Sequence, residues 1–293
     1  MSHGGPAVRH RVLQVGDLAM HVAETGNGDG PLVVLLHGFP ETWWSWRHQL
    51  EPLAHAGFRV VAPDLRGYGE TPSTGPFDID TLATDVARLI EALTPGGRAT
   101  VVGHDWGGAV AWHFAAHHPG RCEKLVVLNC PHPTRMQEAL FKERAPKQLK
   151  SSWYMFFFQL PWVPEWVLTR DAGAFVARMI RGASVDRSRF GDDEVRPFLE
   201  GILRPGNARS MVGWYRAAFR ATFKKSPPPP TIEAPTLLIW GEGDRALHHD
   251  VLIPGTERFV RRLTVERIAG AGHFVHAEAP ERVNPLLLSF LRS

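Results

Sequence analysis

The sequence is poor in cysteine and tyrosine and contains no long hydrophobic run. Its 293 residues include two cysteines and three tyrosines, beside 16 phenylalanines and 10 tryptophans. The most apolar stretch, residues 153–163, is shorter than the roughly 18 residues of a membrane span and contains Gln159 and Pro161. The first residues lack the apolar segment of a secretory signal. We therefore expect a cytoplasmic protein with no membrane partner.

The two cysteines, Cys122 and Cys130, flank an apolar run that predicts a buried strand. An extended segment of this length separates its ends by roughly 26 Å, whereas a disulfide joins Cα atoms within about 7 Å. We therefore expect two free thiols. Two cysteines alone also make no zinc site, so no metal is expected on this ground.

Positive charge is concentrated in the middle of the chain. The net charge is +3, yet residues 132–226 contain 17 Lys and Arg against 9 Asp and Glu. No basic run exceeds two residues, and the sequence has no nucleic-acid-binding motif. This pattern is typical of a solvated, arginine-rich helical face. We expect a monomer or homodimer that binds a small molecule and no nucleic acid.

Short apolar runs alternate with helix-like stretches along most of the chain, which predicts a doubly wound, mostly parallel α/β sheet. A helical, aromatic segment, residues 132–226, interrupts this alternation and precedes four prolines. We predict a core built from residues 1–131 and 227–293, with this insertion as a helical lid. The predicted strands are 9–15, 18–24, 32–36, 59–63, 99–103, 124–129, 236–240 and 263–268, and the predicted core helices are 43–55, 80–93, 107–117 and 280–292.

The segment Gly-His-Asp-Trp-Gly, residues 103–107, joins an apolar run to a helix-like stretch. Its glycines permit a sharp strand-to-helix turn that lifts the central side chain above the sheet. The Asp105 carboxylate is ionised at pH 7 and can attack an sp³ carbon, giving an alkyl ester that water can cleave. The alternative role for an aspartate at this place is a helix cap.

A histidine and an acid follow two of the later strands. His273 stands in a glycine-containing loop where open α/β sheets bind their ligands, and it can deprotonate water at neutral pH. Asp244 directly follows the predicted strand 236–240 and is our preferred acid to orient this histidine. Glu242 and Asp250 are its nearby competitors.

These segments resemble the α/β-hydrolase superfamily, and within it the epoxide hydrolases and the related haloalkane dehalogenases. The resemblance covers nearly the whole chain and includes residues 37–40, His-Gly-Phe-Pro, which in the family supply half of the oxyanion hole. Some relatives carry the acid after the sixth strand, where this chain has Asn129 and Cys130. The resemblance implies an α/β-hydrolase fold with an inserted helical cap, a catalytic triad of Asp105, Asp244 and His273, and an oxyanion hole formed by the amides of Phe39 and Trp106.

The leaving group distinguishes the activities that share this triad. An epoxide opens to an alkoxide and needs a proton donor, which a neutral phenol can be. Tyr154 and Tyr215 lie in the insertion and resemble the two lid tyrosines of epoxide hydrolases. A tyrosine in an apolar helix is otherwise usually part of the core.

A dehalogenase would instead need two donors to a halide. Trp106 fits either class, but Phe39 stands where haloalkane dehalogenases often have asparagine. One of the lid tryptophans, Trp153, Trp162 or Trp166, could instead supply the second donor to the halide. Fluoroacetate dehalogenases carry an arginine at the position of Trp106.

We therefore predict an epoxide hydrolase that converts an apolar aryl or alkyl epoxide to a vicinal diol. Asp105 forms the covalent ester, and water activated by His273 cleaves it. No metal or organic cofactor is expected, because no step moves electrons or needs a Lewis acid. The alternatives are a haloalkane or haloacid dehalogenase with the same nucleophile, and a non-catalytic binding protein of this fold, which would usually lack one of these groups.

Overall fold

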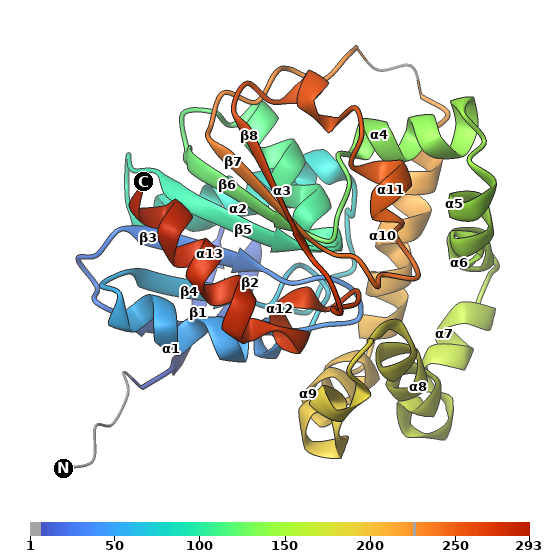
Figure 1. Ribbon diagram of the computed structural model, residues 1–293. Helices are drawn as coiled ribbons and strands as arrows, with labels where there is room; N and C mark the ends of the chain where they lie inside the picture. The colour runs from blue at the N-terminus through green and yellow to red at the C-terminus, as the bar shows by residue number, and fades with distance from the viewer. Residues whose placement is uncertain (1–6, 225–226) are drawn as a thin grey trace.

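The computed structural model describes residues 7–224 and 227–293 and has a sheet with helices on both faces (Figure 1). The strand order is β1-β2-β4-β3-β5-β6-β7-β8. β2 pairs antiparallel with β1 and β4, and all other neighbours are parallel. The strands are β1 (Arg9–Val15), β2 (Leu18–Gly26), β3 (Leu32–Leu36), β4 (Arg59–Pro63), β5 (Ala99–His104), β6 (Cys122–Leu128), β7 (Thr236–Gly241) and β8 (Leu263–Ile268).

The central strands are apolar because helices cover both of their faces. Every residue of β3, β5 and β7 is buried. One hydrophobic cluster joins the sheet to α2 and α3, and a second joins its other face to α1 and α13. The core helices are α1 (Arg47–His55), which follows the 3-10 turn η1 (Trp43–Trp46), α2 (Ile79–Leu93), α3 (Trp106–His117), α11 (His249–Leu252), the 3-10 turn η5 (Thr256–Phe259), α12 (Val275–Glu278) and α13 (Pro280–Arg292).

A helical cap lies between β6 and β7 in the chain and beside one end of the sheet (Figure 1). We use "cap" for residues 133–224. Its helix α10 packs against the core loop that follows β4, where the Trp214 indole donates to the Arg66 carbonyl at 3.1 Å. The cap contains α4 (Pro133–Gln137), the π-helical turn η2 (Glu138–Lys142), α5 (Pro146–Ser151), α6 (Trp153–Phe157), α7 (Val163–Thr169), η3 (Arg170–Gly173), α8 (Ala174–Ala183), η4 (Arg187–Phe190), α9 (Asp192–Leu203) and α10 (Asn207–Ala221).

The predicted doubly wound sheet with its helical insertion is confirmed, and every predicted strand is present. Cys122 and Cys130 are buried free thiols, as expected, and burial raises the pKa of Cys122 to about 12. The predicted boundary between the insertion and the second core segment includes Ser226, which lies outside the described residues. The division into residues 1–131, 132–226 and 227–293 stays a prediction. Within the described chain, no helix has the length and apolar character needed to cross a bilayer.

Candidate active site

Asp105 occupies the sharp turn between β5 and α3. Its backbone angles, φ 48° and ψ −117°, are ones that residues with a side chain rarely adopt. The turn is also tightly packed, because a Cβ atom on Gly107 would collide with the carbonyl oxygen of Leu36. The glycine pattern around Asp105 therefore has a steric cause.

His273 lies between two carboxylates in the loop before α12. Its Nδ1 is 2.7 Å from Asp244 Oδ2, and its Nε2 is 3.7 Å from Asp105 Oδ2. Burial lowers the pKa of His273, but the charge and hydrogen bond of Asp244, followed by the charge of Asp105, raise it to about 9. The imidazole of His273 is therefore protonated on both nitrogens at neutral pH.

Asp244 is fixed by hydrogen bonds from several directions. The amides of Ala246 and Leu247 donate to its Oδ1 at 2.8 and 2.9 Å, and Asn129 Nδ2 donates to its Oδ2 at 2.8 Å. Burial raises the pKa of Asp244, but His273 and these donors lower it overall. The carboxylate therefore stays ionised at neutral pH.

The competing acids do not reach the histidine. Glu242 faces Arg267 at 3.6 Å, and Asp250 pairs with Lys147 at 2.9 Å. Of the three acids considered from the sequence, the structure brings Asp244 to His273.

The turn after β3 contacts the Asp105 carboxylate directly. The Phe39 amide donates to Asp105 Oδ1 at 2.8 Å. A Cβ atom on Gly38 would lie 2.8 Å from the same oxygen, so glycine permits this approach. Among residues 7–224 and 227–293, no hydrogen bond joins the Trp106 amide to this carboxylate, although an amide at the first position of a helix has no partner within that helix. One of the two expected oxyanion-hole donors is thus in contact with Asp105.

The two cap tyrosines approach Asp105 from α6 and α10. The rings of Tyr154 and Tyr215 are 6.0 Å apart, and Tyr215 lies 5.3 Å from Phe39 and 4.9 Å from Trp106, centroid to centroid. Burial, followed by the charge of Asp105, raises the pKa of both tyrosines. Both phenols are therefore proton donors at neutral pH.

The cap tryptophans do not supply a second indole beside Trp106. Trp153, Trp162 and Trp166 are exposed on the outside of the cap, with 58%, 82% and 59% of their surface accessible. Trp214 lies close to Trp106, at 5.7 Å between rings, but its indole N–H is bonded to the Arg66 carbonyl. The sequence allowed a halide site in which a cap tryptophan and Trp106 both donate, and the structure does not form such a site.

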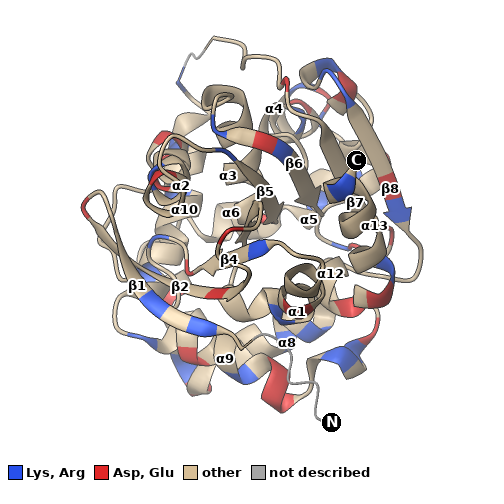
Figure 2. Ribbon diagram, turned by 90° about the vertical axis from the view of Figure 1, so that its left-hand side faces the viewer, with Lys and Arg blue, Asp and Glu red and all other residues tan. Residues whose placement is uncertain are grey.

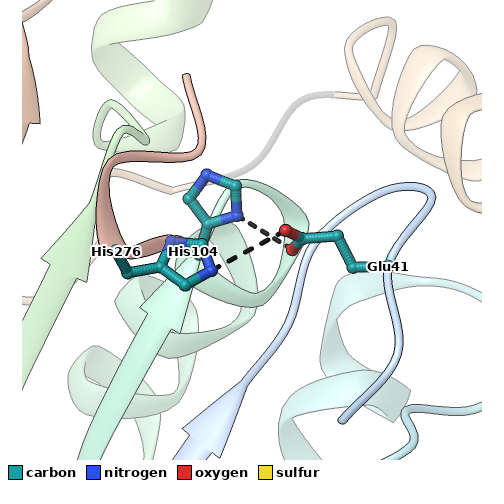
Figure 3. Close-up of side chains that lie close together, drawn as sticks. All are labelled: Glu41, His104 and His276. Carbon is teal, nitrogen blue, oxygen red and sulfur yellow. Dashed lines mark hydrogen bonds and ion pairs between the residues drawn. The ribbon is translucent and has the colours of Figure 1, made fainter. Parts of the chain in front are cut away.

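Behind His273 lies a buried cluster that the sequence analysis missed, in which the Glu41 carboxylate faces two imidazoles (Figure 3). His104 Nδ1 is 2.9 Å from Glu41 Oε2, and His104 Nε2 is 2.9 Å from the His273 carbonyl oxygen. Both ring nitrogens of His104 therefore contact oxygen atoms, one of the Glu41 carboxylate and one of the His273 backbone. These two contacts support the loop that carries His273.

The rest of this cluster is joined by hydrogen bonds. The Ser45 hydroxyl donates to Glu41 Oε1 at 2.6 Å and lies 2.7 Å from His276 Nε2. Burial lowers the pKa of His276, which is therefore neutral. Glu41, His104 and His276 place possible metal-ligand atoms within 4.8 Å of one another. The Glu41 oxygens, however, already accept hydrogen bonds from the protein, including one from the Gly38 amide. The sequence signal was slight: His104 precedes Asp105, and Glu41 follows the His-Gly-Phe-Pro turn.

Comparison with known proteins agrees with this architecture. The family model for the alpha/beta hydrolase fold matches residues 31–280. The AB hydrolase superfamily protein YfhM of Bacillus subtilis is 38% identical over 98% of this chain and 99% of its own. Epoxide hydrolase 4 of Homo sapiens is 34% identical over 94% of this chain and 76% of its own.

Solved structures give the same grouping. The crystal structure of an epoxide hydrolase from Bacillus megaterium in complex with an inhibitor has a TM-score of 0.86 and 30% identity, covering 97% of this chain and 100% of its own. This protein therefore belongs to the α/β-hydrolase fold family and, within it, to the epoxide hydrolases.

Proposed function

We propose that this protein hydrolyses an apolar aryl or alkyl epoxide to a vicinal diol through an alkyl ester on Asp105. The observation that carries the proposal is the pair of cap tyrosines, Tyr154 and Tyr215, whose rings lie 6.0 Å apart and face the strand-to-helix turn of Asp105. Membership in the epoxide hydrolases supports it. The surrounding rings of Phe39, Trp106 and Phe158 favour an apolar substrate.

In the first step, an Asp105 oxygen attacks one ring carbon. Oδ1 is engaged by the Phe39 amide, so Oδ2 is the attacking atom. The bond between that carbon and the ring oxygen breaks, and the oxygen takes a proton from Tyr154 or Tyr215. Solvent then returns a proton to the phenolate. The product is a neutral ester, so the negative charge of Asp105 is gone.

Loss of that charge prepares the second step. The Asp105 carboxylate is one of the causes that raise the pKa of His273. Once it is esterified, the pKa of His273 falls, and the imidazole releases its proton to solvent and becomes a base. It removes a proton from water, which attacks the ester carbonyl carbon. The Phe39 and Trp106 amides stabilise the oxyanion at Oδ1, and His273 then protonates the departing diol oxygen.

We also propose that residues 132–226 form the inserted cap of a core made from residues 1–131 and 227–293. The positions of α6 and α10, which bring the two tyrosines to Asp105, support this division. We keep a cytoplasmic location as a proposal, since two buried free thiols suit a reducing compartment, and likewise a monomeric or homodimeric state.

The test offers the enzyme an aryl epoxide, such as styrene oxide, and a 1-haloalkane in parallel. We expect diol formation without halide release. Halide release without diol would select a dehalogenase, and turnover of neither substrate would favour a non-catalytic binding protein. Asp105→Ala is the control that must abolish diol formation.

A second test separates the two steps. His273→Gln should still form the ester and fail to cleave it, so intact-mass measurement should show an adduct of the substrate's mass.

In a single turnover of the wild-type protein in ¹⁸O-water, the first diol should contain no ¹⁸O, because the oxygen of water enters the Asp105 carboxylate. Labelled diol from the first turnover would contradict the covalent route.

A further inference from the structure

The outer surface of the cap carries large apolar side chains that nothing in the described chain covers. Trp162 and Phe223 have 82% and 72% of their surface accessible, and Trp153 and Trp166 more than half. Soluble proteins rarely expose a contiguous apolar surface of this kind unless it meets a partner. We define the aromatic patch as Trp153, Phe156, Leu160, Trp162, Trp166 and Phe223.

The members of the aromatic patch come from neighbouring elements. Phe156 of α6 lies 5.9 Å from Phe219 of α10, which lies 5.2 Å from Phe223, centroid to centroid. Arg216 of α10 donates to the Leu160 carbonyl at 2.6 Å. The two helices α6 and α7 run along the outer edge of the molecule, away from the sheet (Figure 1). Phe156, Leu160 and Phe223 therefore lie near the exposed side of α10, and Trp153, Trp162 and Trp166 are exposed on the adjacent segments α6 and α7.

The chain around the aromatic patch is strongly basic. Residues 144–170 and 216–224 contain seven Lys and Arg and one acid, Glu165, which pairs with Arg216 at 2.6 Å. Acids beside these segments neutralise two more cations, because Asp171 pairs with Arg170 and Asp250 with Lys147. Four basic side chains form no salt bridge among the described residues: Arg144, Lys150, Arg220 and Lys224. Around the core elements β1, β2 and α1, the two signs are interspersed (Figure 2).

We propose that the aromatic patch docks on the surface of an anionic lipid bilayer. Tryptophan rings favour the headgroup region, and each Lys or Arg near an anionic surface adds about 1 kcal/mol of attraction. Apolar side chains flanked by cations are the usual means by which a protein lies on a membrane without crossing it. A second copy of the chain would instead bring two basic surfaces together, which like-charge repulsion opposes.

This docking departs from the sequence-based expectation of no membrane partner, and it agrees with the absence of a spanning helix from the described residues. It also has a consequence for access to the site. α6 carries Trp153 and Phe156 on its outer side and Tyr154 on the side of Tyr215 and Phe158. If the proposed function is correct, the docked cap lies where apolar epoxides dissolve.

The experiment measures sedimentation of the full chain with vesicles and uses no substrate, so its result does not depend on the proposed function. We expect binding to phosphatidylglycerol-containing vesicles and little binding to phosphatidylcholine alone. Salt of about 0.5 M should weaken the binding, since the Debye length is then only a few Å. Tryptophan fluorescence should shift to shorter wavelength on binding.

Two variants test the two parts of the surface. Trp162→Ser with Trp166→Ser, and separately Lys150→Glu with Arg220→Glu, should each weaken binding about tenfold or more. The matched controls are Val12→Ser, at a 63% exposed residue on β1, and Arg9→Glu, and both should bind like the wild type.

Circular dichroism and melting curves identify variants that fail to fold. Equal binding by all variants, or no binding to anionic vesicles, would overturn the proposal. So would dimerisation that Trp162→Ser abolishes, because it would assign the surface to a second copy.

Discussion

The charge around His273 links the stability of the protein to pH. The pKa of His273 is raised to about 9 in the folded protein, mainly because Asp244 outweighs burial, whereas a free histidine titrates near 6.5. The proton is therefore bound more tightly in the folded state. The resulting stabilisation is fully present below about pH 6.5 and is lost as the pH rises through 9.

We expect the free energy of unfolding of the wild-type protein to fall between pH 6.5 and 9 relative to His273→Gln. The difference should be on the order of 1.4 kcal/mol for each unit of pKa shift. Urea unfolding of both proteins at several pH values measures it. Parallel pH curves for the two proteins would show that His273 is not held as an imidazolium.

The cap tyrosines give the second prediction at this scale. Tyr154→Phe and Tyr215→Phe each remove one proton donor while keeping the ring, so ring opening should slow by about 10² in each and further in the double variant. Rapid-mixing fluorescence measures ester formation. Tyr68→Phe is the matched control, because the buried Tyr68 hydroxyl has no hydrogen-bond partner among the described residues. Loss of activity in Tyr68→Phe alone would mean that the donors were misassigned.

The sequence predicted residues that stand in continuous motifs and missed those defined by tertiary contacts. The five residues of the Asp105 turn and the loop of His273 can be recognised without knowing the fold. The role of Glu41 depends on His104, 63 positions away, and that of Asn129 depends on its 2.8 Å contact with Asp244. A lone acid after a turn has no pattern that distinguishes a buried partner from a solvated side chain.

At the scale of elements, the site is assembled where several strands and loops end together. Glu41 follows β3, His104 ends β5, and His276 lies on α12. Their buried contacts fasten these three segments to one another behind His273. The cluster therefore determines where the histidine loop lies relative to the nucleophile turn.

Glu41→Gln should destabilise the protein strongly, because it removes the buried carboxylate that contacts His104 at 2.9 Å and accepts hydrogen bonds from Ser45 and the Gly38 amide. Removing one partner of a buried ion pair typically costs about 3–5 kcal/mol. Glu70→Gln is the control, since the exposed pair of Glu70 with Arg204 should contribute less than about 1 kcal/mol. Chemical unfolding compares the two, and equal losses would mean that the buried contact between Glu41 and His104 does not stabilise the fold.

The core elements were easier to predict from the sequence than those of the cap. The runs that became β3 and β7 are almost entirely apolar, as is typical of buried parallel strands. Several cap helices are short, since α4 and α6 have five residues each and α7 has seven, and Asp171 and Ala172 have positive φ angles between α7 and α8. Hydrophobic periodicity needs more than one or two turns to define a helix, so the sequence indicated a helical insertion without its individual elements.

At the scale of the whole molecule, cap and core share one hydrophobic interior. The cluster on the α2 and α3 face of the sheet continues into the cap through residues such as Phe158, Phe198 and Trp214. Hydrogen bonds from α10 reinforce it: Asn207 donates to the Gly69 carbonyl at 2.9 Å, and Trp214 to that of Arg66 at 3.1 Å. We infer that the cap does not unfold independently of the sheet.

This inference predicts a single calorimetric unfolding transition for the full chain. Trp214→Phe should lower its midpoint and keep it single, because an unpaired buried carbonyl at Arg66 costs about 1–3 kcal/mol and α10 is loosened where it carries Tyr215. The same variant should therefore lose epoxide turnover, and hydrogen exchange in α10 should quicken.

The control is Arg196→Ala, which removes an exposed pair with Asp193 on α9 and should change neither the unfolding midpoint nor the epoxide turnover. Two resolved transitions in the wild-type protein would mean that the cap is a separate folding unit, and the position of Tyr215 would then depend on cap motion rather than on the shared core.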